Sequence, residues 1–163
     1  MALEFLKRIF NPNKVEIELN EIQALILRSR PIPYFGTVAI IEIKDAVAAR
    51  QMLQKLLPIV SSAEDWHKNE GASVTLTFTY KGLEKIGVPQ ESLDTFPESF
   101  KEGMAERSRF LYDIGVNDPK NWEKVFKRSH IHIAAAVIAN NEEAWKSKLE
   151  EFRSKLANNS GIE

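Results

Sequence analysis

The sequence contains no cysteine among its 163 residues. Disulfides, thiolate nucleophiles, iron-sulfur clusters and sulfur-ligated zinc sites are therefore excluded, and the composition fits a reducing compartment, which predicts a cytoplasmic protein. A surplus of charge is also lacking, because 22 Lys and Arg residues face 23 Asp and Glu residues, for a formal net charge of -1. Without a basic surplus, neither nucleic acid nor an anionic membrane surface is expected as a partner.

Long hydrophobic runs are absent as well, and the apolar stretch at residues 1–10 is interrupted by charges. No membrane-spanning segment or secretory signal is therefore expected. The motifs GxGxxG, GxSxG, HExxH and the P-loop are missing, so dinucleotide, phosphoryl and familiar hydrolytic chemistry lack their usual parts. A hydrophobic content of 44% is enough for one globular domain with its own core.

Three segments have the patterns of β-strands. Residues 74–80 alternate between apolar side chains and threonines, which predicts a strand with one polar face. Residues 37–43 and 131–139 are apolar at nearly every position, which predicts strands covered on both faces. Residues 22–27 are interpreted as a further strand.

Two segments have helical periodicity. Apolar residues recur at helical spacing over residues 46–57, after the candidate N-cap Asp45 and before Pro58, which limits the helix. Asn140, followed three residues later by Glu143, predicts the start of a C-terminal helix that runs to about residue 156.

Residues 81–128 are punctuated by glycine and proline and are interpreted as an ordered excursion with short helices, the longest at residues 98–111. Gly103 inside that helix predicts close packing against another backbone, and the segment around Phe96, Pro97 and Phe100 is typical of an interface. Glu98, Glu102 and Glu106 would share one helical face. We interpret them as a solvated face near Lys101, Arg107 and Arg109, with a carboxylate cluster as the alternative.

The order of these elements predicts an α+β protein: a ferredoxin-like sandwich of the dimeric α+β barrel type, with helices on one face of an antiparallel sheet. The second apolar face of residues 37–43 and 131–139 then needs its own cover. A second sheet, from a partner subunit or from a further domain, would provide it.

The histidines are the remaining candidates for chemistry. His130 and His132 fall on one face of a strand and could ligate a metal or haem, but third and fourth ligands cannot be placed from the sequence. His67, in the run Asp65, Trp66 and His67, could serve in acid–base chemistry. The alternative for all of them is an exposed or hydrogen-bonded structural side chain.

Several segments together resemble a known family. They are residues 22–27, 78–89, 96–97 with Phe100, Gly103 and Met104, Arg107, Asp113, Gly115, Pro119 and Trp122. In order and spacing they resemble the N-terminal half of dye-decolorizing (DyP-type) haem peroxidases, from about residue 20 to the C-terminus. The resemblance implies two ferredoxin-like domains with facing sheets, haem held mainly by the second, and oxidation of dyes and phenolic donors by hydrogen peroxide.

The sequence departs from the family pattern at two places. Tyr112 stands where the family's Leu-Gly-Asp has glycine, and the family's GxxDG motif, whose aspartate works at the distal side of the haem, is absent. Residues 115–119 do not replace it, because they end in Pro119 and match the loop that leads to Trp122. The family's proximal histidine and distal arginine would follow Glu163. The resemblance therefore implies no catalytic, cofactor-binding or metal-binding residue in this chain, and no haem bound by it alone.

These observations lead to three hypotheses. The first has an N-terminal extension at residues 1–20 and, at residues 21–163, the N-terminal domain of a DyP-type peroxidase. This domain would be a scaffold, inactive without the haem-binding half. The second is a stand-alone domain that homodimerises through its sheet face as a binding or assembly module. The third is a small independent haem enzyme that uses His130 or His132.

Overall fold

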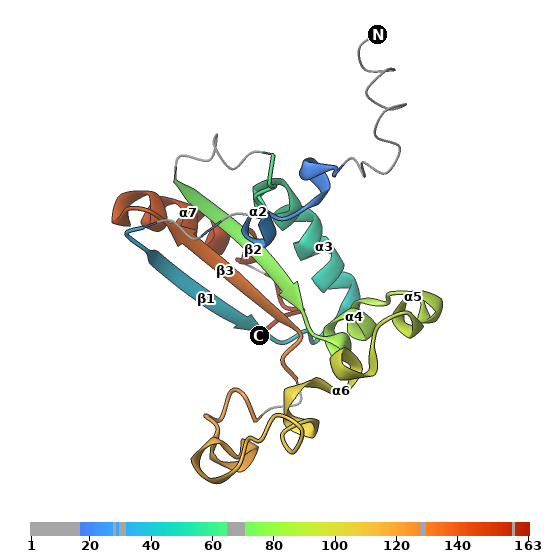
Figure 1. Ribbon diagram of the computed structural model, residues 1–163. Coiled ribbons are helices and arrows are strands. Elements are labelled where there is room, and N and C mark those ends of the chain that lie inside the picture. The colour runs from blue at the N-terminus through green and yellow to red at the C-terminus, as the bar shows by residue number, and fades with distance from the viewer. Residues whose placement is uncertain (1–16, 28, 30–31, 65–70, 128–129, 158) are drawn as a thin grey trace, which may run out of the picture.

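The computed structural model describes residues 17–27, 29, 32–64, 71–127, 130–157 and 159–163. Its centre is an antiparallel sheet of three strands, β1 (Phe35–Ile41), β2 (Ala72–Phe78) and β3 (Ile133–Ala139), in the order β1-β3-β2 (Figure 1). The three predicted strands are confirmed, each within two residues of its expected ends.

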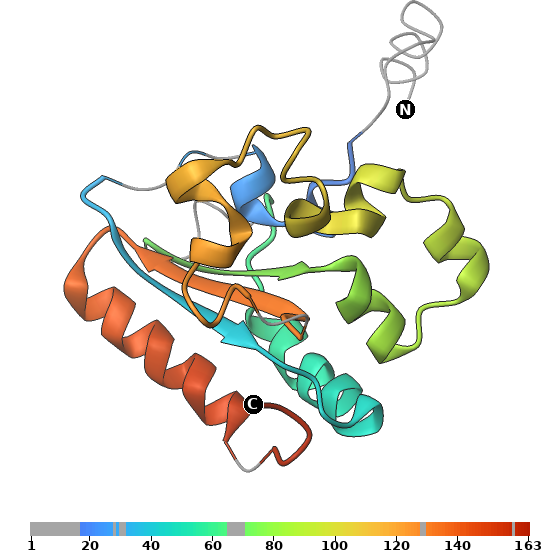
Figure 2. The ribbon, with the colours of Figure 1, turned by 90° about the horizontal axis from the view of Figure 1, so that it is seen from below.

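Two helices, α3 (Ala46–Leu56) and α7 (Glu142–Leu156), cover one face of the sheet (Figure 2). Asp45 caps α3 as predicted, since its carboxylate accepts a hydrogen bond from the Ala48 amide at 2.7 Å. The cap of α7 is Asn141, one residue later than predicted. Asn140 still belongs to the end of the sheet, where its backbone N–H donates to the Gly71 carbonyl at 2.8 Å.

The hydrophobic core lies between the sheet and these two helices. Alternate residues of each strand face the helices, and α3 and α7 supply the opposite wall. The buried residues of this core include Ile41, Val74, Leu76, Ile133, Ala135 and Val137 from the sheet and its ends, with Met52, Leu56, Leu149 and Phe152 from the helices.

The C-terminal residues add a short pairing beyond β1. Ile162 bridges Ile43, and Glu42 and Glu163 exchange backbone hydrogen bonds of 2.7 and 2.9 Å. The spatial order is therefore C-terminal segment, β1, β3, β2, with a helix after β1 and after β3, as in a ferredoxin-like fold. The predicted fold class is confirmed.

The strand predicted at residues 22–27 is wrong. This segment follows the 3-10 helix η1 (Leu19–Glu21) and contains only an isolated bridge from Gln23 to Ser62 before the helix α2 (Ala24–Leu27) begins. The backbone of this segment does not join the sheet. Instead, the side chain of Gln23 makes hydrogen bonds to the backbone of Leu76 in β2.

The excursion after β2 holds the helices α4 (Tyr80–Ile86), α5 (Gln90–Asp94) and α6 (Glu98–Glu106), and the 3-10 helices η4 (Gly115–Asn117) and η5 (Pro119–Asn121). A further 3-10 helix, η2 (Leu57–Ile59), follows α3. The long helix predicted at residues 98–111 is interrupted by Gly103, at φ 75° and ψ 177°. No atom lies within 4 Å of a Cβ placed on Gly103, so the predicted close packing there is wrong and the glycine supplies a positive φ.

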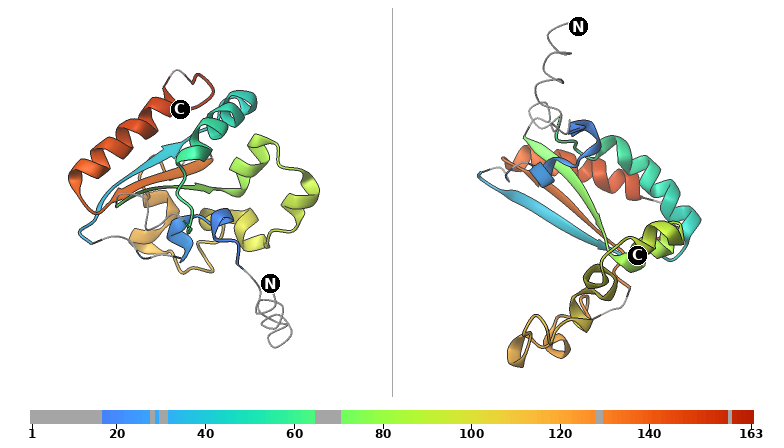
Figure 3. Two further views of the ribbon diagram at one scale, coloured as in Figure 1. Left: turned by 90° about the horizontal axis from the view of Figure 1, so that it is seen from above. Right: turned by 45° about the vertical axis from the view of Figure 1, so that its right-hand side comes forward.

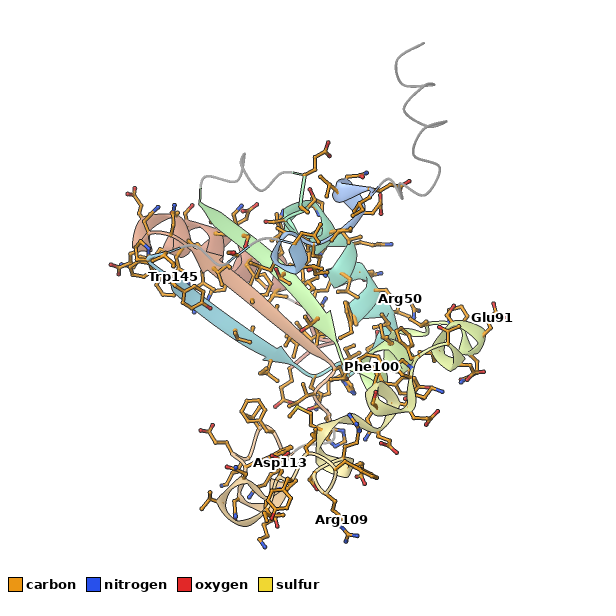
Figure 4. The ribbon with its side chains drawn as sticks, in the orientation of Figure 1. Arg50, Glu91, Phe100, Arg109, Asp113 and Trp145 are labelled. Atoms are coloured by element: carbon orange, nitrogen blue, oxygen red, sulfur yellow. The ribbon has the colours of Figure 1, made fainter. Side chains whose placement is uncertain are left out.

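The close approach lies instead at Gly82 in α4. A Cβ there would lie 2.1 Å from the backbone oxygen of His132, just before β3. Arg50 reinforces this attachment, since its guanidinium donates a hydrogen bond to the Ile86 carbonyl at 2.7 Å (Figure 4). Among the described residues, no helix has the length and apolar character needed to cross a membrane.

Candidate functional site

The face of the sheet turned away from α3 and α7 is the first component of the candidate site, and we call it the open face. The register places side chains from all three strands in rows across it, for example Val38, Ala136 and Thr75. Its members are Gly36, Val38, Ile40, Ser73, Thr75, Thr77, Ala134, Ala136 and Ile138.

Cover over the open face is uneven. On the β2 side, Ser73 and Thr75 are buried, and α2 packs there with Ala24 fully inaccessible. On the β1 side, Val38 is 58% exposed, and the described residues leave it uncovered. The second apolar face predicted for residues 37–43 is therefore left uncovered at β1 by the described residues.

The second component is the segment of residues 107–127, which we call the arm. Figures 2 and 3 show it leaving the end of the sheet on the side opposite α3 and α7. Short-range hydrogen bonds hold its shape, such as Trp122 Nε1 to the Asn117 carbonyl at 2.8 Å. Its large apolar side chains are nevertheless exposed, and they include Phe110, Leu111, Tyr112, Ile114, Val116 and Phe126. Such a concentration of exposed apolar groups is typical of an interaction surface.

Three aromatic side chains fasten the base of the arm. Phe100 of α6 packs edge-on against Tyr80 of α4, with ring centroids 6.3 Å apart, and against Phe96 at 5.0 Å (Figure 4). The segment that we interpreted as interface architecture therefore packs against this chain's own α4, where such pairs add stability beyond their burial.

His132 is a buried structural histidine. Its Nδ1 accepts a hydrogen bond of 2.8 Å from the Ile43 amide, so the remaining proton is on Nε2. Burial lowers the pKa of His132, against the opposing attraction of Glu42. The side chain is therefore neutral near pH 7 and one of its nitrogens is committed to the backbone.

The other predicted ligands do not converge. His130 is exposed, and the described part of the chain holds no group of three or more His, Asp or Glu side chains suited to a metal ion. Among the described residues, the predicted ligands therefore form no metal-binding cluster. The alternative acid–base run at residues 65–67 lies outside the described residues.

The glutamates of α6 form local ion pairs. Glu98 lies 2.9 Å from Lys101, and Glu102 lies 3.6 Å from Arg107. The break at Gly103 separates both from Glu106, so the three carboxylates do not share one continuous helical face. The interpretation as solvated residues holds, and the alternative of a carboxylate cluster is not supported.

One charged cluster escaped the sequence analysis. Lys44 Nζ lies 2.7 Å from Glu42 and 3.0 Å from Glu163, and hydrogen bonds to both carboxylates raise the pKa of Lys44. The cluster stands beside the backbone pairing of Glu42 with Glu163. No sequence signal identifies it, because it depends on the C-terminus folding back along the end of β1.

Comparison with known proteins gives a consistent result. The family model of the DyP dimeric alpha+beta barrel domain matches residues 21–162. Among solved structures, an ancestral D-type dye decolorizing peroxidase is 26% identical with a TM-score of 0.77, covering 91% of this chain and 34% of its own. No curated protein matches the sequence.

More distant structures share the fold. DyP2 from Amycolatopsis sp. ATCC 39116 is 20% identical, with a TM-score of 0.74 and coverage of 89% of this chain and 31% of its own. A decolorizing peroxidase from Auricularia auricula-judae is 17% identical, with a TM-score of 0.72 and coverage of 90% and 32%. The chain thus spans about a third of the length of these proteins. With the family model matched over nearly its whole length, the chain belongs to the DyP dimeric alpha+beta barrel domain family.

Proposed function

We propose that residues 21–163, preceded by a short extension at residues 1–20, are the N-terminal scaffold domain of a cytoplasmic haem peroxidase that oxidises dyes and phenolic donors with hydrogen peroxide. In this proposal the open face packs against a second α+β domain, and that domain holds the haem. The chain alone is inactive.

The observation that carries the proposal is the uncovered apolar surface on one side of the molecule. Val38 at the open face and Phe110 and Val116 on the arm are more than half exposed, although the opposite face of the sheet holds the hydrophobic core. Burying apolar area contributes roughly 25 cal/mol per Å², so a second sheet placed here would be strongly stabilised. The family match and the short span of the chain relative to solved peroxidases support the same proposal.

The proposal assigns haem chemistry to the other domain, in keeping with the lack of a cluster of three or more metal-ligating side chains among the residues described here. The buried histidine His132 commits Nδ1 to the Ile43 amide, and burial keeps it neutral. This chain contributes the wall against which the haem-bearing domain is positioned.

The direct test is titration of the purified chain with haemin. We expect neither a stoichiometric, histidine-ligated Soret band nor peroxide-dependent bleaching of a dye. The matched control carries both His130→Asn and His132→Asn, since haem adhering to the apolar surface would bind it equally well. Stoichiometric ligation and turnover by the native chain, both lost in the variant, would refute the scaffold assignment in favour of an independent haem enzyme.

The second candidate function is a homodimeric binding module, favoured by the same open face and by the dimeric barrel of the family. Light scattering distinguishes the two. Val38→Lys places a charge on the open face, and Val47→Lys, at an equally exposed position on α3, is its control. A discrete native dimer that only Val38→Lys dissociates would favour the homodimer. A monomer, or aggregation that Val38→Lys suppresses, supports the two-domain proposal.

A further inference from the structure

His132 lies where the ends of β1, β2 and α4 meet the start of β3. Its backbone N–H donates to the Ile41 carbonyl at 3.1 Å, which joins it to β1. Its carbonyl accepts from the Thr79 amide at 3.0 Å and lies against Gly82 of α4. The residue is only 7% exposed. A change in the charge of this ring therefore acts on several elements at once.

The ring of His132 extends the contact between β1 and β3 by one hydrogen bond. The Ile43 amide donates to its Nδ1 atom at 2.8 Å. The nearby Ile131 carbonyl is turned to the other side, where it accepts from the Thr79 hydroxyl at 2.8 Å. A ring nitrogen that accepts a hydrogen bond carries no proton. Protonation of Nδ1 would place two N–H donors against each other in a buried site, so this bond exists only while the ring is neutral.

Residues 42–45 pair with residues 159–163, and we call this pair of segments the corner ribbon. Glu42 and Glu163 exchange two backbone hydrogen bonds, and the Gly161 carbonyl accepts from two consecutive amides at 2.7 and 3.1 Å. In the described part of the chain, no backbone hydrogen bond joins residues 42–45 to β3. Two-stranded ribbons are marginally stable by themselves. The bond to the His132 ring therefore links the corner ribbon to the β3 side of the sheet.

Charged groups surround the ring from each element packed against it. Burial is the main influence and lowers the pKa of His132, whereas the charge of Glu42 at the end of β1 raises it. Lys85 of α4, His130 before β3 and Lys44 oppose the protonated ring. Lys44 lies 2.7 Å from Glu42, and this contact lowers the pKa of Glu42. Glu42 therefore stays ionised at mildly acidic pH and can attract a protonated ring.

We propose that His132 is an acid-sensitive switch whose protonation releases the Ile43 amide and detaches the corner ribbon from the β3 side, while the three-stranded sheet stays formed. The neutral ring holds the closed state through Nδ1. The charged ring cannot accept from Ile43 and is attracted by the Glu42 carboxylate. The switch goes beyond the proposed function, because it changes the β1 side of the domain with or without a haem-bearing neighbour.

The test follows backbone amide exchange by NMR at about pH 7.5 and about pH 5.5, expressed as protection relative to the unfolded chain at each pH. The reporters are the amides of Ile43, Lys44 and Glu163 in the corner ribbon. The references are the amides of Ser61 and Asn140, which bond to Val74 and Gly71 away from the corner ribbon.

The expected change follows from the uptake of one proton. For an open state whose ring has a pKa near 6.5, opening becomes up to about tenfold more favourable between these two pH values. We therefore expect protection of the three reporter amides to fall by about five- to tenfold at the lower pH. The two reference amides should stay within about twofold of their protection at the higher pH.

Three variants identify the group responsible. His132→Asn keeps an acceptor for the Ile43 amide but does not titrate, so its reporter amides should be equally protected at both pH values. His130→Asn is the matched control at an exposed histidine, and it should retain the loss of protection. Glu42→Gln removes the charge that favours the protonated ring, so the loss should move to lower pH. This variant keeps His132 and leaves the switch testable if His132→Asn does not fold.

Three results would overturn the inference. They are reporter protection that does not change with pH in the native chain, a loss that persists in His132→Asn, and an equal loss at Ser61 and Asn140. The last result would mean that the whole sheet opens and that the corner ribbon has no separate transition. These readouts involve no haem, peroxide or second domain, so failure here and failure of the proposed function are distinguishable.

Discussion

Replacement of Gly82 by alanine tests how the excursion is attached to the sheet. Gly82 is buried in α4, and its amide donates to the Thr79 hydroxyl that caps this helix. An added Cβ would lie 2.1 Å from the oxygen of His132, more than 1 Å inside ordinary contact distance. This oxygen belongs to the backbone and accepts from the Thr79 amide at 3.0 Å, so it cannot move without weakening the junction of β2 and β3.

The expected cost follows from two opposing effects. Overpacking of a rigid interior costs about 1 to 3 kcal/mol, and contact with a backbone atom places this site at the upper end. Alanine in a helix recovers about 1 kcal/mol relative to glycine. We therefore expect Gly82→Ala to lower the free energy of unfolding by about 2 kcal/mol, which corresponds to a fall in Tm of roughly 4 to 8 °C for a chain of this size.

Urea denaturation followed by circular dichroism measures this change. Gly36→Ala is the matched control, since its Cβ would meet the end of the Tyr34 side chain at 2.5 Å, and this exposed side chain can move away. We expect that control to stay within about 0.5 kcal/mol of the native chain. A Gly82→Ala protein as stable as the native chain would refute the claim that α4 docks through backbone contact.

Three further predictions concern stability. Tyr112 is exposed and has φ 60°, so Tyr112→Gly should raise the free energy of unfolding by about 0.5 to 1 kcal/mol; an unchanged urea midpoint would contradict this. Burial lowers the pKa of His132 below its unfolded value near 6.5, so stability should fall, by at most about 1.4 kcal/mol per pH unit, as pH drops through this value. His132→Asn keeps an acceptor for the Ile43 amide and should flatten that dependence in urea titrations between about pH 7.5 and pH 6. Gln23→Ala should cost about 1 to 2 kcal/mol and accelerate amide exchange at Leu76, and unaltered exchange would show that this side chain does not close the edge.

The sequence predicted the framework because each of its elements has a strong local pattern. The threonine alternation of β2, the Asp45 cap and the apolar spacing of α7 all act over a few residues. The two-sided apolar pattern of residues 37–43 also predicted the open face. Helices cover one side of β1, so the apolar side chains on its other side form that face.

Features that depend on distant contacts were not predictable. Gly103 and Gly82 both lie inside helical patterns, and only the fold shows that one supplies a positive φ and the other a backbone contact with His132. Residues 22–27 have strand-like composition, but the Gln23 side chain satisfies β2 directly. A groove between Thr37 of β1 and Trp145 and Leu149 of α7 depends on where this helix crosses the strand, which no local pattern encodes.

The unfinished surfaces of this domain lie together on the β1 side. On the β2 side, α2 covers the open face, and Gln23 and Ser61 close the edge. On the β1 side, Val38 is uncovered and its outward backbone groups have no partner among the described residues. The second domain of the proposed function would cover the sheet on this side. At the end of β1, the charge of Lys44 is already paired with Glu42 and Glu163. This arrangement favours a domain that positions a neighbouring domain and supplies no charged group for chemistry, as the proposed scaffold role requires.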